Sequence, residues 1–229
     1  MTESQARRLW DRASDLGSGG HIVEIGSFRG RSAIVLAQAA DASVEVVAID
    51  PHAGNDRGPQ QIEGTADEGQ TDHEAFLANL ERAGVQDRIR HVRLPSSQAS
   101  GEVDGEIDLL YIDGAHRYRF VREDITMWAP RVTEGGTLLI HDSFSSMGVT
   151  LGLIRWLFLS GDFRYLGRAG SMAEYRREPL RGGKRLRNAL RQSLELPWFV
   201  RNVVIKVLLV LRLRPLTRLL GHRDATWPY

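Results

Sequence analysis

A glycine-bearing turn is the first segment of this chain whose residues could serve a ligand. In EIGSFRGRS, residues 24–32, Gly26 and Gly30 stand between an apolar run and a helix-like run. Glycine lets the backbone approach a ligand where a Cβ atom would clash, and the start of a helix offers unpaired amide donors. The spacing is GxxxG rather than the GxGxxG of dinucleotide binders, which disfavours a nicotinamide cofactor. The alternative is a plain strand-to-helix turn with no ligand.

A second candidate is Asp50, which ends an apolar run roughly 20 residues beyond that turn. In open α/β sheets a carboxylate at this position accepts hydrogen bonds from both hydroxyls of a ribose. An aspartate before a proline, here Pro51, is by itself more often a turn former. Together with the glycine turn, ribose binding is favoured. Further polar residues also follow apolar runs, where such sheets bind their ligands: Asp113, His116, His141 and Asp142.

Strand-like and helix-like segments alternate along the chain, which predicts an α/β, Rossmann-like, doubly wound fold. We expect strands over residues 21–25, 44–49, 89–94, 107–112, 137–140, 163–167 and 171–177. We expect helices over residues 3–16, 31–40, 74–83, 117–128 and near 151–159. The last two strands, joined by a tight turn, would add an antiparallel edge hairpin. The prediction is a mostly parallel seven-stranded sheet with a C-terminal helical extension.

A long polar stretch follows Asp50. Residues 51–73 comprise 23 positions with four glycines and no clear periodicity. Loops of this length in compact domains are usually lids or disordered segments. The position of this loop directly after the predicted ribose acid would suit a lid that closes over a cofactor and excludes water.

The composition excludes several kinds of chemistry. The chain has 229 residues, of which 42% are hydrophobic and 26% charged, as in ordinary soluble globular domains. Because it contains no cysteine, thiol nucleophiles, disulfides, zinc fingers, iron–sulfur clusters and cysteine-dependent pyrimidine methylation are ruled out. The polar N-terminal segment lacks the apolar core of a secretory signal, so a cytoplasmic location is expected.

The charge is divided unevenly between two parts of the chain. Residues 1–180 hold 19 Lys and Arg against 27 Asp and Glu, a net charge of −8, whereas residues 181–229 hold 11 against 2, a net charge of +9. This break predicts a catalytic-sized domain, residues 1–180, and a basic amphipathic helical extension, residues 181–229. Residues 203–213 are apolar except for Lys206 and Arg212. This segment is too short and too charged to span a membrane, which takes about 20 apolar residues. The extension is expected to pack on the domain, pack on a second subunit, or lie on an anionic membrane surface.

Five segments, in order and spacing, resemble class I S-adenosylmethionine-dependent methyltransferases: VEIGSFRGRS, VVAIDPH, LPSSQ, IDLLYIDGAHRYRFVREDI and GGTLLIHD. More narrowly, they resemble the metal-dependent O-methyltransferases of the macrolide-sugar and catechol types. The resemblance covers residues 20–177. It implies an enzyme that uses S-adenosylmethionine and a divalent cation, Mg²⁺ or Mn²⁺. The implied reaction is methylation of a hydroxyl on a sugar, a glycan or a related small molecule.

The resemblance also implies where the cofactor lies. Glu24 and Gly26 would contact its methionine end, Asp50 its ribose, and Ser97 and Gln98 its adenine. The complete set of predicted cofactor-binding residues is Glu24, Gly26, Ser27, Gly30, Ser32, Asp50, Ser97, Gln98 and Asp113.

By the same resemblance, Asp113 and Asp142 would be metal ligands. The chain departs from the family at residue 141, because His141 stands where relatives carry an acid. Imidazole suits Mn²⁺ better than Mg²⁺, so His141 is a candidate third metal ligand, a base or a packing residue. His116 stands close to where catechol-type enzymes place a catalytic lysine, and its neutral imidazole suits a general base at pH 7. The candidates for the base are therefore His116, His141 or neither.

Two other functions are compatible with parts of the sequence. The basic extension could bind phosphate in a nucleic-acid methyltransferase, but the acidic body and the absence of a DPPY or NPPY segment disfavour it. A non-catalytic S-adenosylmethionine-binding scaffold is a third possibility. The expected partners are a small-molecule or glycan acceptor, lipid-linked if the extension binds membrane, and a second copy if the C-terminal helices pair. If the membrane interpretation holds, the protein would lie peripherally on the inner membrane face.

Overall fold

The computed structural model describes residues 1–54 and 64–222. Within these residues a seven-stranded sheet has the order β3-β2-β1-β4-β5-β7-β6. Its strands are β1 (His21–Ile25), β2 (Glu45–Ile49), β3 (Ile89–Val92), β4 (Ile107–Ile112), β5 (Val132–Ile140), β6 (Phe163–Ala169) and β7 (Met172–Arg177). Strands β1 to β5 are parallel, and β7 pairs antiparallel with both β5 and β6. This arrangement confirms the predicted Rossmann-like fold and its antiparallel edge.

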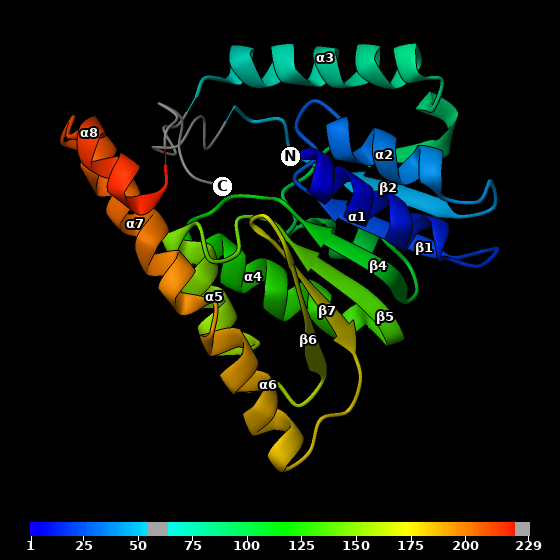
Figure 1. Cartoon of the computed structure of the whole chain (residues 1–229). Coiled ribbons are helices and arrows are strands. Elements are labelled where there is room, and N and C mark those ends of the chain that lie inside the picture. The colour runs from blue at the N-terminus through cyan, green and yellow to red at the C-terminus, as the bar shows by residue number, and fades with distance from the viewer. Residues whose placement is uncertain (55–63, 223–229) are drawn as a thin grey trace.

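The helices cover both faces of the sheet (Figure 1). They are α1 (Glu3–Ser14), α2 (Arg31–Ala39), α3 (Ala66–Ala83), α4 (Tyr118–Trp128), α5 (Met147–Trp156), α6 (Gly183–Ser193), α7 (Leu196–Val210) and α8 (Arg214–Thr217). Four short 3₁₀ segments accompany them: Gln86–Arg88, Ala99–Glu102, Ala129–Arg131 and Arg218–Leu220.

Two hydrophobic cores lie on opposite faces of the sheet because strand side chains alternate between its faces. On β1, Ile22 joins the core under α1, α2 and α3, whereas Val23 joins the core under α4 and α5. The first core includes Leu36 and Phe76, and the second includes Trp128. With both faces covered, the central strands are apolar on both sides, which explains the continuous apolar runs in the sequence.

Three elements begin four or more residues before their predicted starts. Helix α3 begins at Ala66 rather than at residue 74, because Thr65 and Glu68 form a capping box that satisfies the first turn. Eight residues of the predicted 51–73 loop are therefore helical. The remainder of the proposed lid includes residues 55–63, which lie outside the described residues. Strand β5 starts five residues earlier than predicted, at Val132, and α5 starts four residues earlier, at Met147.

The C-terminal extension packs on the body of the protein. Asn188 of α6 accepts a hydrogen bond from the backbone N–H of Tyr165 at 2.8 Å and donates to the carbonyl of Phe163 at 3.0 Å. Helix α6 thereby covers β6, an edge strand whose backbone groups would otherwise lack partners. Helix α7 buries Asn202 and Ile205 against the domain. No helix among the described residues is long and apolar enough to cross a membrane.

Candidate functional site

Four predicted site residues lie in a row along the carboxyl edge of the sheet. Each donates its backbone N–H to the last carbonyl of the neighbouring strand, one residue beyond its own strand. The distances are 3.2 Å for Asp50 to Val92, 2.9 Å for Gly26 to Ile49, 2.8 Å for Asp113 to Ile25 and 2.9 Å for His141 to Ile112. With strands about 4.8 Å apart, the row from Asp50 to His141 spans about 14 Å. A cofactor with separated ribose and methyl-donor ends has this extent.

The two glycines of the first turn have specific backbone roles. Gly26 has a φ of 89°, and a Cβ atom there would collide with the carbonyl oxygen of Asp113. Gly30 has a φ of 82° as the N-cap of α2, and a Cβ atom there would lie 3.1 Å from a ring carbon of Phe76. Both positions thus require glycine because other segments of the protein lie too close for a Cβ atom. This reason is separate from the binding of a ligand.

Glu24 is a buried carboxylate without a hydrogen-bond partner. Neither of its oxygens, nor the hydroxyl of neighbouring Ser27, has a partner among the described residues. Burial raises the pKa of Glu24 to about 7, although the nearby Ser32 and Ser27 hydroxyls oppose that rise. An unpaired acid inside a protein is costly, and a cationic ligand group would relieve that cost. Glu24 is therefore prepared for a positively charged partner.

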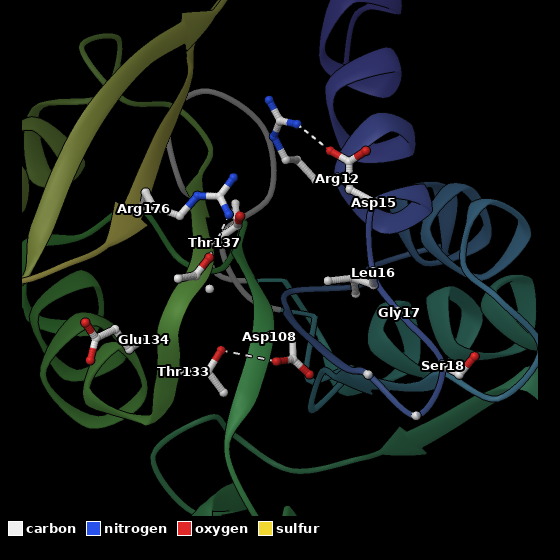
Figure 2. A pocket seen from close by; sticks show the side chains of 14 residues that line it. Arg12, Asp15, Leu16, Gly17, Ser18, Asp108, Thr133, Glu134, Thr137 and Arg176 are labelled. Carbon is white, nitrogen blue, oxygen red and sulfur yellow. Dashed lines mark hydrogen bonds and ion pairs between the residues drawn. The ribbon is translucent and has the colours of Figure 1, made fainter.

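A cavity of about 740 Å³ is lined in part by four of the predicted cofactor residues, Gly26, Ser27, Ser32 and Asp113. A second cavity, of about 450 Å³, lies at the opposite edge of the sheet, beside the starts of β4 and β5 (Figure 2). Some of its polar side chains pair with one another, as in the 3.1 Å hydrogen bond from Thr133 to Asp108. Of the two cavities, the first is the one that predicted cofactor residues line.

Asp50 is held in one orientation by two backbone amides. Oδ2 accepts from the N–H of Phe28 at 2.8 Å, and Oδ1 accepts from the N–H of His52 at 2.7 Å. Phe28 and His52 both have left-handed backbone conformations, with φ of 46° and 47°, which bring these amides to the carboxylate. Each oxygen keeps a second lone pair, so the carboxylate can still accept a pair of hydroxyl donors.

The predicted adenine residues lie on the loop after β3. Ser97 and Gln98 are exposed there. The preceding residue, Ser96, was not predicted, yet its hydroxyl donates to Asp124 of α4 at 2.5 Å. Burial raises the pKa of Asp124 to about 6, and the Ser96 hydrogen bond opposes that rise. The Ser96 hydrogen bond holds the loop after β3 against α4. The side chains of Ser97 and Gln98 are then available to a ligand.

At the other end of the row, four residues form a chain of ion pairs. His141 Nδ1 lies 3.0 Å from Asp113 Oδ1 and 3.5 Å from Asp142 Oδ1. His116 Nε2 lies 3.0 Å from Asp142 Oδ2. The structure thus brings together the metal-ligand and base candidates from the ends of β4 and β5.

Asp113 and His141 each shift the pKa of the other. Burial raises the pKa of Asp113, but His141 and then His116 outweigh it, so the net change is downward. Burial lowers the pKa of His141, but Asp113 and then Asp142 outweigh it, so the net change is upward. Of the two candidate bases, His116 is the more accessible to an acceptor, with 31% of its side chain exposed against 10% for His141.

Three supporting residues were missed by sequence analysis. The Tyr111 hydroxyl donates to Asp113 Oδ2 at 2.9 Å, and the Ser171 hydroxyl donates to Asp142 Oδ1 at 3.4 Å. Gln5 of α1 in turn donates to Ser171 at 3.1 Å. Tyr111 could have been found, because residues two apart on a strand share a face. Ser171 and Gln5 could not, since their proximity depends on the sheet order.

The predicted metal ligands are of types that bind divalent cations, and they lie close to one another. His141 Nδ1 lies 3.0 and 3.5 Å from oxygens of Asp113 and Asp142. Adjacent ligands of a cation with bonds of about 2.1 Å lie about 3 Å apart. However, no group of three or more His, Cys, Asp or Glu side chains in residues 1–54 and 64–222 is arranged as a ready-made metal site. Binding would require these side chains to turn toward one point.

A family model described as a methyltransferase domain matches residues 23–143, which is more than half of the chain. The chain therefore belongs to this family of methyltransferases. The match includes the glycine turn and Asp113, and it extends to His141 and Asp142.

Solved structures share the fold at low identity. The O-methyltransferase TomG from Streptomyces achromogenes, solved in complex with SAM, is 18% identical, with 78% of this chain and 82% of that one covered and a TM-score of 0.57. An O-methyltransferase from Bacillus cereus, in complex with SAH, is 18% identical over 77% and 82% of the two chains, with a TM-score of 0.54. CalS11, a TDP-rhamnose 3'-O-methyltransferase, is 18% identical over 75% and 77%, with a TM-score of 0.50. The protein is thus a methyltransferase with the class I fold, and two of these similar structures, TomG and the Bacillus cereus enzyme, were solved with SAM or SAH bound.

Proposed function

We propose that this enzyme transfers the methyl group of S-adenosylmethionine to a hydroxyl oxygen of a sugar, a glycan or a related small molecule. One observation carries the proposal: His116 lies 3.0 Å from Asp142, at one end of the row of site residues along the carboxyl edge of the sheet. A hydroxyl must lose its proton to become a good nucleophile, and an imidazole oriented by a carboxylate is suited to remove it.

The cofactor would lie along the carboxyl edge. Its methionine ammonium would meet Glu24, whose buried charge lacks a partner. Its ribose hydroxyls would donate to Asp50, and its adenine would lie by Ser97 and Gln98. Asp113 would then be next to the methyl donor. This orientation places the sulfonium between the ribose acid and the ion-paired residues at the ends of β4 and β5.

Methyl transfer is an in-line displacement, so alignment is the main task of the protein. The acceptor oxygen attacks the methyl carbon, the carbon–sulfur bond breaks, and the sulfonium becomes a neutral thioether. The acceptor proton goes to Nδ1 of His116, because Nε2 of that ring faces Asp142. His116 is partly exposed, with 31% of its side chain accessible, so an acceptor can reach it.

A divalent cation would be held by Asp113, Asp142 and His141. When bound, it would lower the pKa of the acceptor hydroxyl and fix its orientation. Tyr111 and Ser171 each donate to one of the two carboxylates, so the chain itself orients the oxygens that such an ion would use.

Two observations support a sugar over a catechol as acceptor. The segments IDGAHRY and IHD resemble those of the sugar-modifying enzymes, and the relative CalS11 is named for a TDP-rhamnose substrate. We therefore expect hydroxylated sugars, free or attached to a larger molecule, to be methylated.

The test uses purified protein with methyl-labelled S-adenosylmethionine and parallel panels of nucleotide sugars, glycans, catechols and RNA. Mass spectrometry should find the label as a methyl ether on a sugar. The variant Asp142→Asn should lose that activity while it still binds S-adenosylhomocysteine. Label on a nitrogen atom or in RNA would refute the proposal.

A further inference from the structure

Helix α6 exposes a stripe of leucines on the side that faces away from the protein. Leu186 and Leu190 are each 60% exposed, and Leu194 is 79% exposed. Their spacing of four residues places them along one face of the helix. The buried residues Asn188 and Gln192 lie on the opposite face, toward the domain. Most of the surface of each leucine is therefore not used in the packing of α6 on its own chain.

Helix α7 repeats this arrangement. Val200, Val204 and Val207 are exposed at helical spacing, whereas Asn202 and Ile205 on the opposite side are buried. In Figure 1, α6 and α7 follow one another along one side of the molecule. Because both helices pack on the same body, their apolar stripes face outward on the same side. We call these six residues, three on each helix, the outer apolar face.

The chain around this face is strongly basic. Among residues 181–222 there are ten Lys and Arg residues but a single acid, Glu195, and that acid is paired with Arg168 at 2.8 Å. Exposed cations flank the leucines of α6, at Lys184 and Arg187. An apolar stripe bordered by cations matches a surface with an apolar interior and anionic head groups.

We infer that the outer apolar face binds the surface of a membrane that contains anionic lipids. A symmetric contact between two copies would place this basic face against itself, and like charges would oppose it. Anionic head groups instead attract each nearby cation, while the leucines and valines enter the boundary of the acyl region. Helix α7 has 15 residues and would lie on the membrane rather than cross it.

This orientation has a consequence for the acceptor. Lys206 of α7 donates to the carbonyl of Ser145 at 2.8 Å, three residues after Asp142. The membrane-facing helix is therefore attached to the loop that carries the candidate acceptor site. If the proposed hydroxyl methylation holds, the acceptor would be an amphiphilic or lipid-linked glycan, whereas lipid binding does not depend on that chemistry.

The test is sedimentation of the full-length protein with vesicles of phosphatidylcholine, alone or mixed with phosphatidylglycerol, at low salt. The wild type should bind the mixed vesicles and bind the neutral ones at least about 30-fold more weakly. Leu190→Glu should weaken binding by about tenfold or more. Leu77→Glu, on α3 and 48% exposed, is the matched control and should bind like the wild type.

The charge contribution is tested separately. The double change Lys184→Gln and Arg187→Gln should weaken binding to the mixed vesicles by about 30-fold, and Arg7→Gln on α1 should leave it unchanged. Circular dichroism checks that each variant is folded, and Leu194→Glu replaces Leu190→Glu if the latter is not.

Three results would overturn the inference. They are failure of the wild type to bind mixed vesicles, equal binding to neutral ones, and an effect of Leu77→Glu as large as that of Leu190→Glu. A wild-type dimer in sedimentation velocity that Leu190→Glu dissociates, without vesicle binding, would assign the face to a second copy instead. Each of these outcomes is independent of whether methyl transfer to a hydroxyl is observed.

Discussion

The unpaired carboxylate of Glu24 makes the cofactor-free enzyme sensitive to pH. Its pKa is raised by burial from 4.5 to about 7, which corresponds to about 3 kcal/mol. Because the folded state prefers the protonated acid, this stability is fully present below about pH 4.5 and is lost as the pH rises through about 7. The substitution Glu24→Gln imitates the neutral acid at every pH.

We therefore expect Glu24→Gln to stabilise the cofactor-free protein by about 3 kcal/mol well above pH 7 and to have little effect near pH 4.5. For a protein of this size, the gain is a rise in melting temperature of roughly 6 to 12 °C. Thermal unfolding across this pH range measures it. Glu102→Gln, a change on the exposed surface, is the control and should shift nothing.

The same variant tests the role of Glu24 in cofactor binding. A ligand ammonium prefers the ionised acid, so wild-type affinity for S-adenosylhomocysteine should fall up to about tenfold per pH unit below pH 7. Glu24→Gln should bind weakly at every pH and show no such slope. If Glu24→Gln destabilises the protein equally at both ends of the pH range, the carboxylate has a partner and the argument is wrong.

Other predictions concern the remaining positions of the row. Asp50→Ala should weaken S-adenosylhomocysteine binding in calorimetry by about 10-fold to 150-fold, through the loss of charge-assisted hydrogen bonds to ribose, and unchanged affinity would remove Asp50 from the site. His116→Ala should lower kcat by about 10² to 10⁴ with cofactor affinity intact, and if His141→Ala shows that loss instead, the two roles are reversed. EDTA should abolish turnover and Mg²⁺ or Mn²⁺ should restore it, and full activity in chelator would exclude the cation.

Much of the fold could be predicted because local and tertiary signals agree. Strands β1 and β4 have the predicted bounds, since each is an apolar run ended by a polar or glycine residue. The start of α3 was missed because the glycines at positions 64 and 69 suggested a loop. The capping box formed by Thr65 and Glu68 was the signal that should have outweighed them.

The position of the site could be predicted more fully than its contacts. Parallel strands end at one edge, so residues after β1, β2, β4 and β5 had to lie in a row. Which side chains pair within that row depends on turns that no pattern reveals. Asp142 has a φ of 51°, a left-handed conformation that directs its carboxylate between His141 and His116.

The two sides of helices α6 and α7 in the basic extension have different roles. The change in composition near residue 180 coincides with a change in the surface, because α6 and α7 leave an outer apolar face bordered by cations. Their inner sides are joined to the body by Asn188, which pairs with edge strand β6, and by Lys206, which donates to the loop after β5. Helix α7 is thereby connected to the loop that carries Asp142. A surface that binds this extension can therefore bring its own hydroxyl groups to the enzyme and also stabilise the loop that would orient them.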